Sequence, residues 1–374
     1  MKLSNIFFST LAVLLCCTAC SKDDNSIKWK DADASLSITV KAAGSATTKG
    51  FHPNDENELA GEAKVNNLSV LVFNESGSEI IGYGWQATNS EGEATILNVP
   101  ALTMRAQIVI VSNTPENSLA TVENYSDFES KLAQLSDQSQ DNLVMSSRVI
   151  ETQKALVRGD NYLGYSTMGD ENINGIDEPV EITRLAARLD LVNAKTNFTK
   201  SLLRNRTVRV EEVSILNQST ASRFFSHDYW GVVMATGHLA NSEATALNRN
   251  IANGSPINDT PYVHYVMEND GSESPTEIQV RATLLETADY EAETKIFTAV
   301  INRNGLEKGY NHNYVKRNYV YRLNITFGDT SFDGDHEKDP NPPIPPTPPT
   351  PTTGDLDVQV EVVNWGEVSQ EVEI

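Results

Sequence analysis

The chain has 374 residues, with 29 Lys and Arg against 51 Asp and Glu, and a formal net charge of −22. A charge this negative argues against a nucleic-acid-binding protein, because contacts to phosphates need a basic surface. The length is sufficient for two domains of ordinary size, and beyond the N-terminus no apolar stretch is long enough to cross a bilayer.

The first residues have the composition of a secretory signal. Lys2 precedes an apolar run over residues 6–17, which is too short to span a membrane but fits the apolar region of a signal peptide. The run ends in small residues before Cys20, and this arrangement resembles the lipobox of bacterial lipoproteins, in which the cysteine is lipidated. The acidic residues that follow resemble a tag for the outer face of the outer membrane in the Bacteroides group. We predict a lipoprotein signal peptide over residues 1–19, with a plain signal peptide as the alternative.

The cysteines are consistent with this prediction. All three, Cys16, Cys17 and Cys20, lie in the signal or at its edge. The mature body therefore holds no thiol besides the lipidated one, which excludes disulfides, cysteine metal sites and thiol nucleophiles.

The body is predicted to be all-β. Short alternating runs separated by turn residues are typical of β-sandwich domains. One helix is predicted after Ser126, where Ser126 and Glu129 form a capping box and Phe128, Leu132 and Leu135 share one face. The runs that predict strands include residues 68–73, 106–111, 207–210 and 278–282.

A break in the pattern lies between Gly169 and Pro179, in a stretch rich in Asp, Asn and Gly. We place the domain boundary there, with an N-terminal β-sandwich over residues 50–177 and a C-terminal β-sandwich over residues 178–338. A new strand is expected to begin at Ile182.

A proline-rich arm follows over residues 339–354 and favours an extended, stiff conformation. Residues 355–374 then contain one strand pattern, in which four apolar residues alternate with polar ones. A single strand is not stable alone in water and must pair with a sheet. Its inward face is predicted to consist of Leu356, Val358, Val360 and Val362, with Trp365 beyond them.

A strand near the start of the mature chain has the same pattern, with Leu36, Ile38, Val40 and Ala42 on one face. Because the inward face sets the register of a strand, both segments could fill the same groove. The alternative, which periodicity alone does not exclude, is that both are ordinary strands of one monomer.

The segment after the first strand is small, polar and basic, and is suited to a trypsin-like protease that cuts between Lys49 and Gly50. Residues 20–49 would then be a lipidated pro-segment with a removable strand. Loss of that strand would leave an exposed sheet edge and an apolar groove that another chain can fill. Such head-to-tail contacts do not close and therefore build a filament.

Taken in order, these features resemble the fimbrillin family, the two-domain lipoprotein pilins of type V pili. The resemblance is carried by the signal, the basic site at Lys49, and four loose motifs at residues 182–189, 262–269, 316–323 and 360–365. It implies two tandem transthyretin-like β-sandwich domains with a minor helix and a C-terminal donor strand after the proline-rich arm.

The resemblance also implies a function. It predicts a non-enzymatic structural subunit of a surface fimbrium that is processed by a surface protease and polymerises by donor-strand exchange with identical or related pilin subunits. Because the chain has both a removable strand and a donor strand, a shaft position is favoured, and a tip adhesin is the nearest variant. Adhesion to a host or bacterial surface ligand would follow, and no cofactor is expected.

Three further motifs have simpler interpretations. Residues 170–181 match the spacing of a calcium loop, although a solvated turn between domains is favoured because no helix pattern precedes them. Arg158-Gly159-Asp160 is an integrin-type tripeptide, and residues 227–230 could line a sugar site; a surface turn and a packed loop are the simpler interpretations. The six histidines show no metal-binding spacing, and the sequence has no G-x-S-x-G, P-loop or G-x-G-x-x-G motif. A monomeric surface glycan-binding lipoprotein is the alternative function.

Overall fold

The computed structural model describes residues 31–43, 58–224, 238–252, 254–257, 262–303, 305, 312–338, 351–354 and 357–365, with the backbone alone for residues 359–364. The signal peptide, Cys20, Lys49, Gly50, residues 227–230, most of the proline-rich arm and Leu356 lie outside the described residues. Among the described residues, no helix has the length and apolar character needed to cross a membrane.

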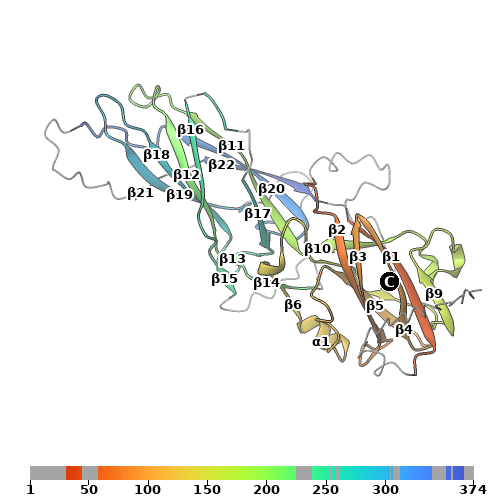
Figure 1. Cartoon of the computed structure of the whole chain (residues 1–374). Coiled ribbons are helices and arrows are strands. Elements are labelled where there is room, and N and C mark those ends of the chain that lie inside the picture. Colours follow the sequence, from red (N-terminus) through yellow and green to blue (C-terminus); the bar gives the residue numbers. More distant parts are fainter. Residues whose placement is uncertain are drawn as a thin grey trace, which may run out of the picture.

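The described residues form an all-β fold with one short α-helix, as predicted, and make up two units placed end to end (Figure 1). In the N-terminal unit the strands follow the order β3-β2-β5-β7-β10-β1-β4, with β8 paired to β5 and β9 paired to β1. Its elements are β1 (Ala34–Ala42), β2 (Lys64–Asn74), β3 (Ile80–Glu91), β4 (Glu93–Ala101), β5 (Ala106–Ser112), α1 (Tyr125–Ser130), β6 (Leu132–Gln134), η3 (Leu135–Asp137), β7 (Met145–Ser146), β8 (Ile150–Glu151), β9 (Gly159–Leu163), η4 (Gly169–Glu171), η5 (Ile173–Gly175) and β10 (Val180–Arg184).

Two main sheets of the C-terminal unit pack on each other, and residues 218–219 and 239–240 form a separate two-stranded sheet. One main sheet has the order β17-β11-β20-β22 and the other main sheet β16-β12-β18-β19-β21. Its strands are β11 (Ala186–Asn197), β12 (Val208–Leu216), β13 (Gln218–Ser219), β14 (Ala221–Arg223), β15 (Leu239–Ala240), β16 (Thr245–Ile251), β17 (Tyr262–Met267), β18 (Glu277–Leu284), β19 (Glu293–Val300), β20 (Tyr319–Gly328), β21 (Thr352–Thr353) and β22 (Asp357–Asn364).

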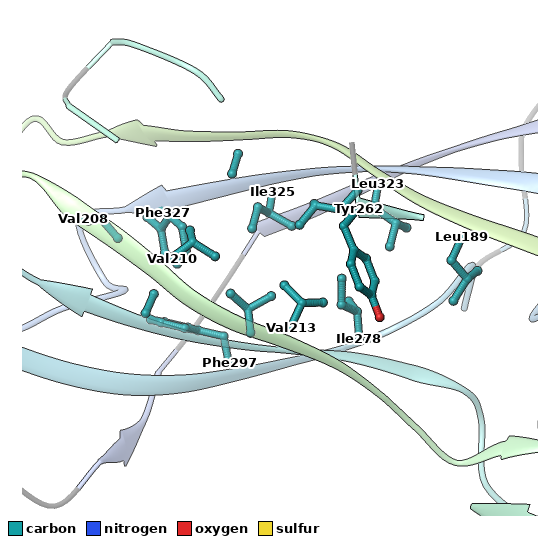
Figure 2. Packing of buried hydrophobic residues seen from close by; sticks show 14 of the residues in the cluster. Leu189, Val208, Val210, Val213, Tyr262, Ile278, Phe297, Leu323, Ile325 and Phe327 are labelled. Carbon is teal, nitrogen blue, oxygen red and sulfur yellow. The ribbon is translucent and has the colours of Figure 1, made fainter. Parts of the chain in front are cut away.

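Alternation of apolar residues explains both cores. In the C-terminal unit, side chains from the two sheets interdigitate, among them Leu189, Val213, Phe297 and Leu323 (Figure 2). In the N-terminal unit, one face of β2 and β5 packs against β1, β4 and β10. The other face of β2 and β5 is covered by α1, whose Phe128 packs against Phe73.

The boundary between the units differs from the prediction. The sequence pattern predicts that the second domain begins at residue 178, but β10 pairs with β1 and β7 in the N-terminal sheet. The change of sheet occurs at Leu185, between β10 and β11. The continuous apolar alternation over residues 182–191 concealed two strands, because the chain passes from one sheet to the next with a single intervening residue.

The helix is also shorter than predicted, and its cap is a different residue. Asn124 is the N-cap, and its side-chain oxygen accepts a hydrogen bond from the Asp127 amide at 2.9 Å. The helix ends at Ser130, and Leu132 lies in β6 instead of continuing the helical face. The reason is tertiary, since β6 pairs with β14 of the C-terminal unit. This pairing also joins the two units.

Candidate functional site

The strand β1 lies inside the N-terminal sheet. On one side it pairs antiparallel with β4, and on the other it pairs parallel with β9 along its first half and with β10 along its last residues. The prediction of a border strand whose loss exposes one edge is therefore wrong. Removal of β1 would open a slot with two facing edges, so a replacement strand could gain main-chain hydrogen bonds on both sides.

The predicted inward face of β1 is fully enclosed. Leu36, Ile38 and Val40 have no exposed surface, and Ala42 is 1% exposed. All four belong to the core of the N-terminal unit. Burial of each large aliphatic side chain contributes about 1.5–3 kcal/mol before ordering costs. The apolar face of β1 is therefore seated entirely within the core of the N-terminal unit.

Polar contacts hold β1 along its length. Thr39 Oγ1 lies 3.0 Å from Thr95 Oγ1 on β4. Lys41 Nζ lies 3.5 Å from Glu181 Oε1 on β10, with side-chain exposures of 14% and 6%. These two contacts fix the register of β1, since a shift by one residue would bring Thr39 and Lys41 into the apolar core.

The start of β1 is also anchored. The Thr103 amide donates to Asp33 Oδ1 at 2.9 Å, and Arg158 Nη2 lies 3.2 Å from Asp33 Oδ2. Hydrogen bonds from Thr103 lower the pKa of the Asp33 carboxyl. Arg158 belongs to the integrin-type tripeptide, which lies exposed at the start of β9, where the Gly159 amide donates to the Asp33 carbonyl at 2.9 Å.

The C-terminal strand β22 pairs with β20 of its own chain. The register places Val358, Val360 and Val362 opposite residues 325, 323 and 321 of β20. Val358 packs against the core of the C-terminal unit. In the single chain, therefore, β1 and β22 occupy different sheets in different units, as the simpler interpretation of their patterns allowed.

Trp365, which directly follows β22, is buried at the junction of the two units with 2% of its surface exposed. Its Nε1 donates to Glu62 Oε2 at 3.0 Å. Its ring stacks on Tyr265 with centroids 5.9 Å apart, and the guanidinium carbons of Arg184 and Arg188 lie 4.9 and 5.4 Å from its ring centroid. The end of the strand is therefore fastened to the N-terminal unit.

Glu62 is the centre of this junction and has no exposed surface. Its carboxylate accepts from Arg188 Nη1 at 2.7 and 2.8 Å and from the Tyr265 hydroxyl at 2.6 Å. It also accepts from the Leu59 amide at 2.7 Å. Burial raises the pKa of Tyr265, and its hydrogen bond to Glu62 raises it further. With Trp365, these donors compensate a buried charge that would otherwise be very costly.

Arg184 connects the same junction to the end of β1. Its Nη1 donates to the Ala43 carbonyl at 2.7 Å, its Nε donates to the Glu62 carbonyl at 3.1 Å, and it forms an ion pair with Glu58. Burial lowers the pKa of Arg184. One guanidinium thus binds both segments that flank the region containing Lys49. Sequence reasoning missed this cluster, and the only available signal was two arginines within the apolar alternation of residues 182–191.

The candidate calcium loop does not assemble as a cage. The Asn172 and Asn174 side-chain oxygens accept from the backbone amides of Tyr165 and Gln153. Glu181, which would be the last ligand, points to Lys41. The required carboxylate and amide oxygens are therefore directed to different partners.

Within the described residues, one group of metal-type ligands comes together at Glu293, Asp333 and His336. Lys295 Nζ lies 3.1 Å from Glu293 Oε1 and 3.0 Å from Asp333 Oδ2. The lysine ammonium thus occupies the position between these two carboxylates, and the cluster is an ion-pair network.

Comparison with known proteins agrees with the two-unit organisation. Residues 34–184 match the model of the major fimbrial subunit protein FimA, and residues 185–365 match the model of the C-terminal domain of Fim1C-like fimbrium tip subunits. The chain is 48% identical over 371 residues to a Parabacteroides distasonis protein provisionally named fimbrium tip subunit Fim1C, covering 98% of both chains. It is 24% identical over 410 residues to the major fimbrium subunit FimA type-2 of Porphyromonas gingivalis, covering 99% of both chains.

Solved structures of similar proteins share the fold of this chain. A crystal structure of a provisionally named cell adhesion protein from Parabacteroides distasonis superposes with a TM-score of 0.79 at 47% identity, covering 91% of this chain and 99% of that chain. The fimbrilin FimA from Porphyromonas gingivalis has a TM-score of 0.57 at 16% identity over 91% of this chain and 99% of that chain, which reflects the shared fold. The chain is therefore a member of the fimbrillin family of fimbrial subunit proteins.

Proposed function

We propose that this chain is a subunit of a cell-surface fimbrium that becomes competent for assembly when β1 leaves its slot and a strand from another subunit replaces it. In this proposal the precursor is an outer-membrane lipoprotein anchored at Cys20, and a trypsin-like protease cuts between Lys49 and Gly50. After that cut, β1 is held only by non-covalent contacts.

The observation that carries the proposal is the position of β1. It pairs on both sides and its apolar face is buried. Its only covalent connection to the rest of the unit is through residues 44–57, which contain Lys49. A strand in this position can be exchanged for another with the same pattern, whereas a surface strand would leave no comparable binding site. The two tandem units are proposed to be of the transthyretin-like type that the family implies.

We place the subunit at the end of a filament in preference to its shaft, which the sequence alone favoured. The Parabacteroides distasonis relative and the family model of the C-terminal unit both carry the name of a tip subunit. In addition, β22 is seated on β20, and Trp365 is buried in its own chain. A terminal subunit needs to accept a strand, while donation by residues 355–374 is required only of a subunit within the shaft.

Mass spectrometry of sheared fimbriae tests this proposal. We expect the assembled form to begin at Gly50 and to be present at about one copy per filament. A Lys49→Gln variant is expected to remain unprocessed and unassembled, whereas Lys154→Gln, a control at an exposed lysine, is expected to assemble normally. Assembled subunits that still carry residues 31–43 would contradict the exchange of β1, and a copy number equal to that of the main shaft protein would contradict the terminal position.

A further inference from the structure

The slot of β1 has a charge requirement that the apolar pattern does not reveal. Lys41 is the cross-strand partner of Glu181 on β10 and of Glu93 on β4. It forms an ion pair with Glu181, whose side chain is only 6% exposed. A strand that occupies this slot must therefore place a side chain between two carboxylates, one of which is nearly buried.

The chain's own C-terminal segment does not meet this requirement. When Leu356, Val358, Val360 and Val362 are placed on the seats of Leu36, Ile38, Val40 and Ala42, Glu361 takes the position of Lys41. Three acidic side chains would then lie side by side across the strands, and like charges in directly opposed cross-strand positions are destabilising.

Other registers of the C-terminal segment do not place a cation at the position of Lys41 either. A shift by two residues places Gln359 or Val363 at the position of Lys41, and the shift that brings in Val363 also puts Asn364 on the inward seat of Ala42. Residues 339–374 contain no Lys, Arg or His and seven acidic residues. No register of this segment can therefore supply a cation between Glu93 and Glu181.

We infer that the Glu93–Glu181 pair selects the strand that enters the slot, and that it favours a partner subunit whose strand carries Lys or Arg at the position of Lys41 and rejects a second copy of this chain. This inference rests on the proposed strand exchange and adds the identity of the donor. It provides a physical reason for a subunit that joins a filament of other proteins without polymerising by itself, because mismatched charges act against the wrong partner.

The test uses the full mature chain, cut at Lys49 and checked by mass. Fluorescent peptides with the sequence of residues 32–43 (the β1 peptide) or 354–365 (the tail peptide) compete for the slot, and anisotropy reports the fraction bound. We expect the β1 peptide to enter and its Lys41→Glu version to bind at least about tenfold more weakly, which corresponds to about 1.4 kcal/mol. The tail peptide is expected to gain at least about tenfold on Glu361→Lys substitution.

A matched control peptide separates the effect of the position of the lysine from the effect of the peptide's net charge. The Asp357→Lys tail peptide has the same net charge as the Glu361→Lys peptide but carries its lysine at the seat of Ser37, so it is expected to gain much less. A Glu181→Gln protein is expected to reduce the Lys41→Glu penalty. Equal gains for the two tail peptides, or a β1 peptide that tolerates Lys41→Glu, would overturn the charge selection. Failure of the unmodified β1 peptide to enter would refute strand exchange itself, and this inference with it.

Discussion

Replacement of Glu62 by alanine removes the acceptor on which the junction of the two units depends. Arg188, Tyr265, Trp365 and the Leu59 amide all donate to this carboxylate, which has no exposed surface. Removal of one partner from a buried ion pair typically costs about 3–5 kcal/mol, because the other charge stays buried without compensation.

The structure indicates the lower end of this range. Arg188 also donates to both carboxylate oxygens of Asp190 at 2.9 Å, so its guanidinium would keep one anionic partner. We therefore expect Glu62→Ala to lower the free energy of unfolding by about 3 kcal/mol. Glu62→Gln retains an acceptor for Trp365 and Tyr265 and is expected to lose less.

Urea unfolding monitored by tryptophan fluorescence measures this effect. Lys338→Gln serves as the control, because Lys338 Nζ lies 2.9 Å from Glu286 Oε2 in an exposed pair, and such pairs contribute about 0–1 kcal/mol. If Glu62→Ala costs no more than the Lys338→Gln control, the junction does not depend on this buried charge.

Three further predictions concern the positions of β22 and β1 and a half-buried histidine. Trp365→Phe retains the stacking but loses the indole donor, so amide hydrogen exchange of β22 is expected to quicken by about ten- to a hundredfold, since hydrogen bonds to charged groups contribute about 1.5–3 kcal/mol. Unchanged exchange would refute a role of Trp365 in fastening the strand. Gly164 has φ +80°, and a Cβ there would lie 2.6 Å from a backbone oxygen of β1. Gly164→Ala is therefore expected to lower the thermal midpoint more than the control Gly175→Ala, because Gly175 has φ +69° but open space around it. Equal shifts of the midpoint would contradict the close approach of Gly164 to β1. Partial burial lowers the pKa of His312 from 6.5 to about 4, so the unfolded chain binds a proton more readily than the folded chain. The stability that the neutral imidazole contributes is present above about pH 6.5 and is lost as the pH falls toward 4. His312→Gln is expected to flatten the difference in stability between pH 7 and pH 4.5, and an unchanged pH profile would argue against a neutral imidazole in the folded chain.

Local sequence patterns were sufficient for the all-β class and for the inward face of β1. The alternation of Leu36, Ile38 and Val40 correctly predicts which side chains are buried, because a strand with one apolar face has only one stable orientation on a core. The same alternation does not say how many strands flank it. The parallel partners β9 and β10 lie more than one hundred residues away, and nothing in residues 36–42 encodes them.

The errors have a common cause in tertiary contacts. The helical pattern at Leu132 fails because β6 pairs with β14 across the junction. The cluster around Glu62 joins residues separated by 126 positions from Arg188 and by 303 positions from Trp365. Such contacts bring polar residues together only after the strands around them have packed, so the spacing of these residues along the chain does not predict the contacts.

Locking β1 in its slot tests directly whether this strand must leave before assembly. Thr39 and Thr95 are cross-strand partners with hydroxyl oxygens 3.0 Å apart. Directly opposed Cα atoms of antiparallel strands are about 4.5–5.5 Å apart, within the range that a disulfide accepts. The mature body has no cysteine besides Cys20, so Thr39→Cys with Thr95→Cys would form a specific crosslink. The measurement is incorporation of this cut and crosslinked subunit into fimbriae, with and without reductant. We expect incorporation only after reduction, and incorporation with the crosslink intact would contradict the exchange of β1.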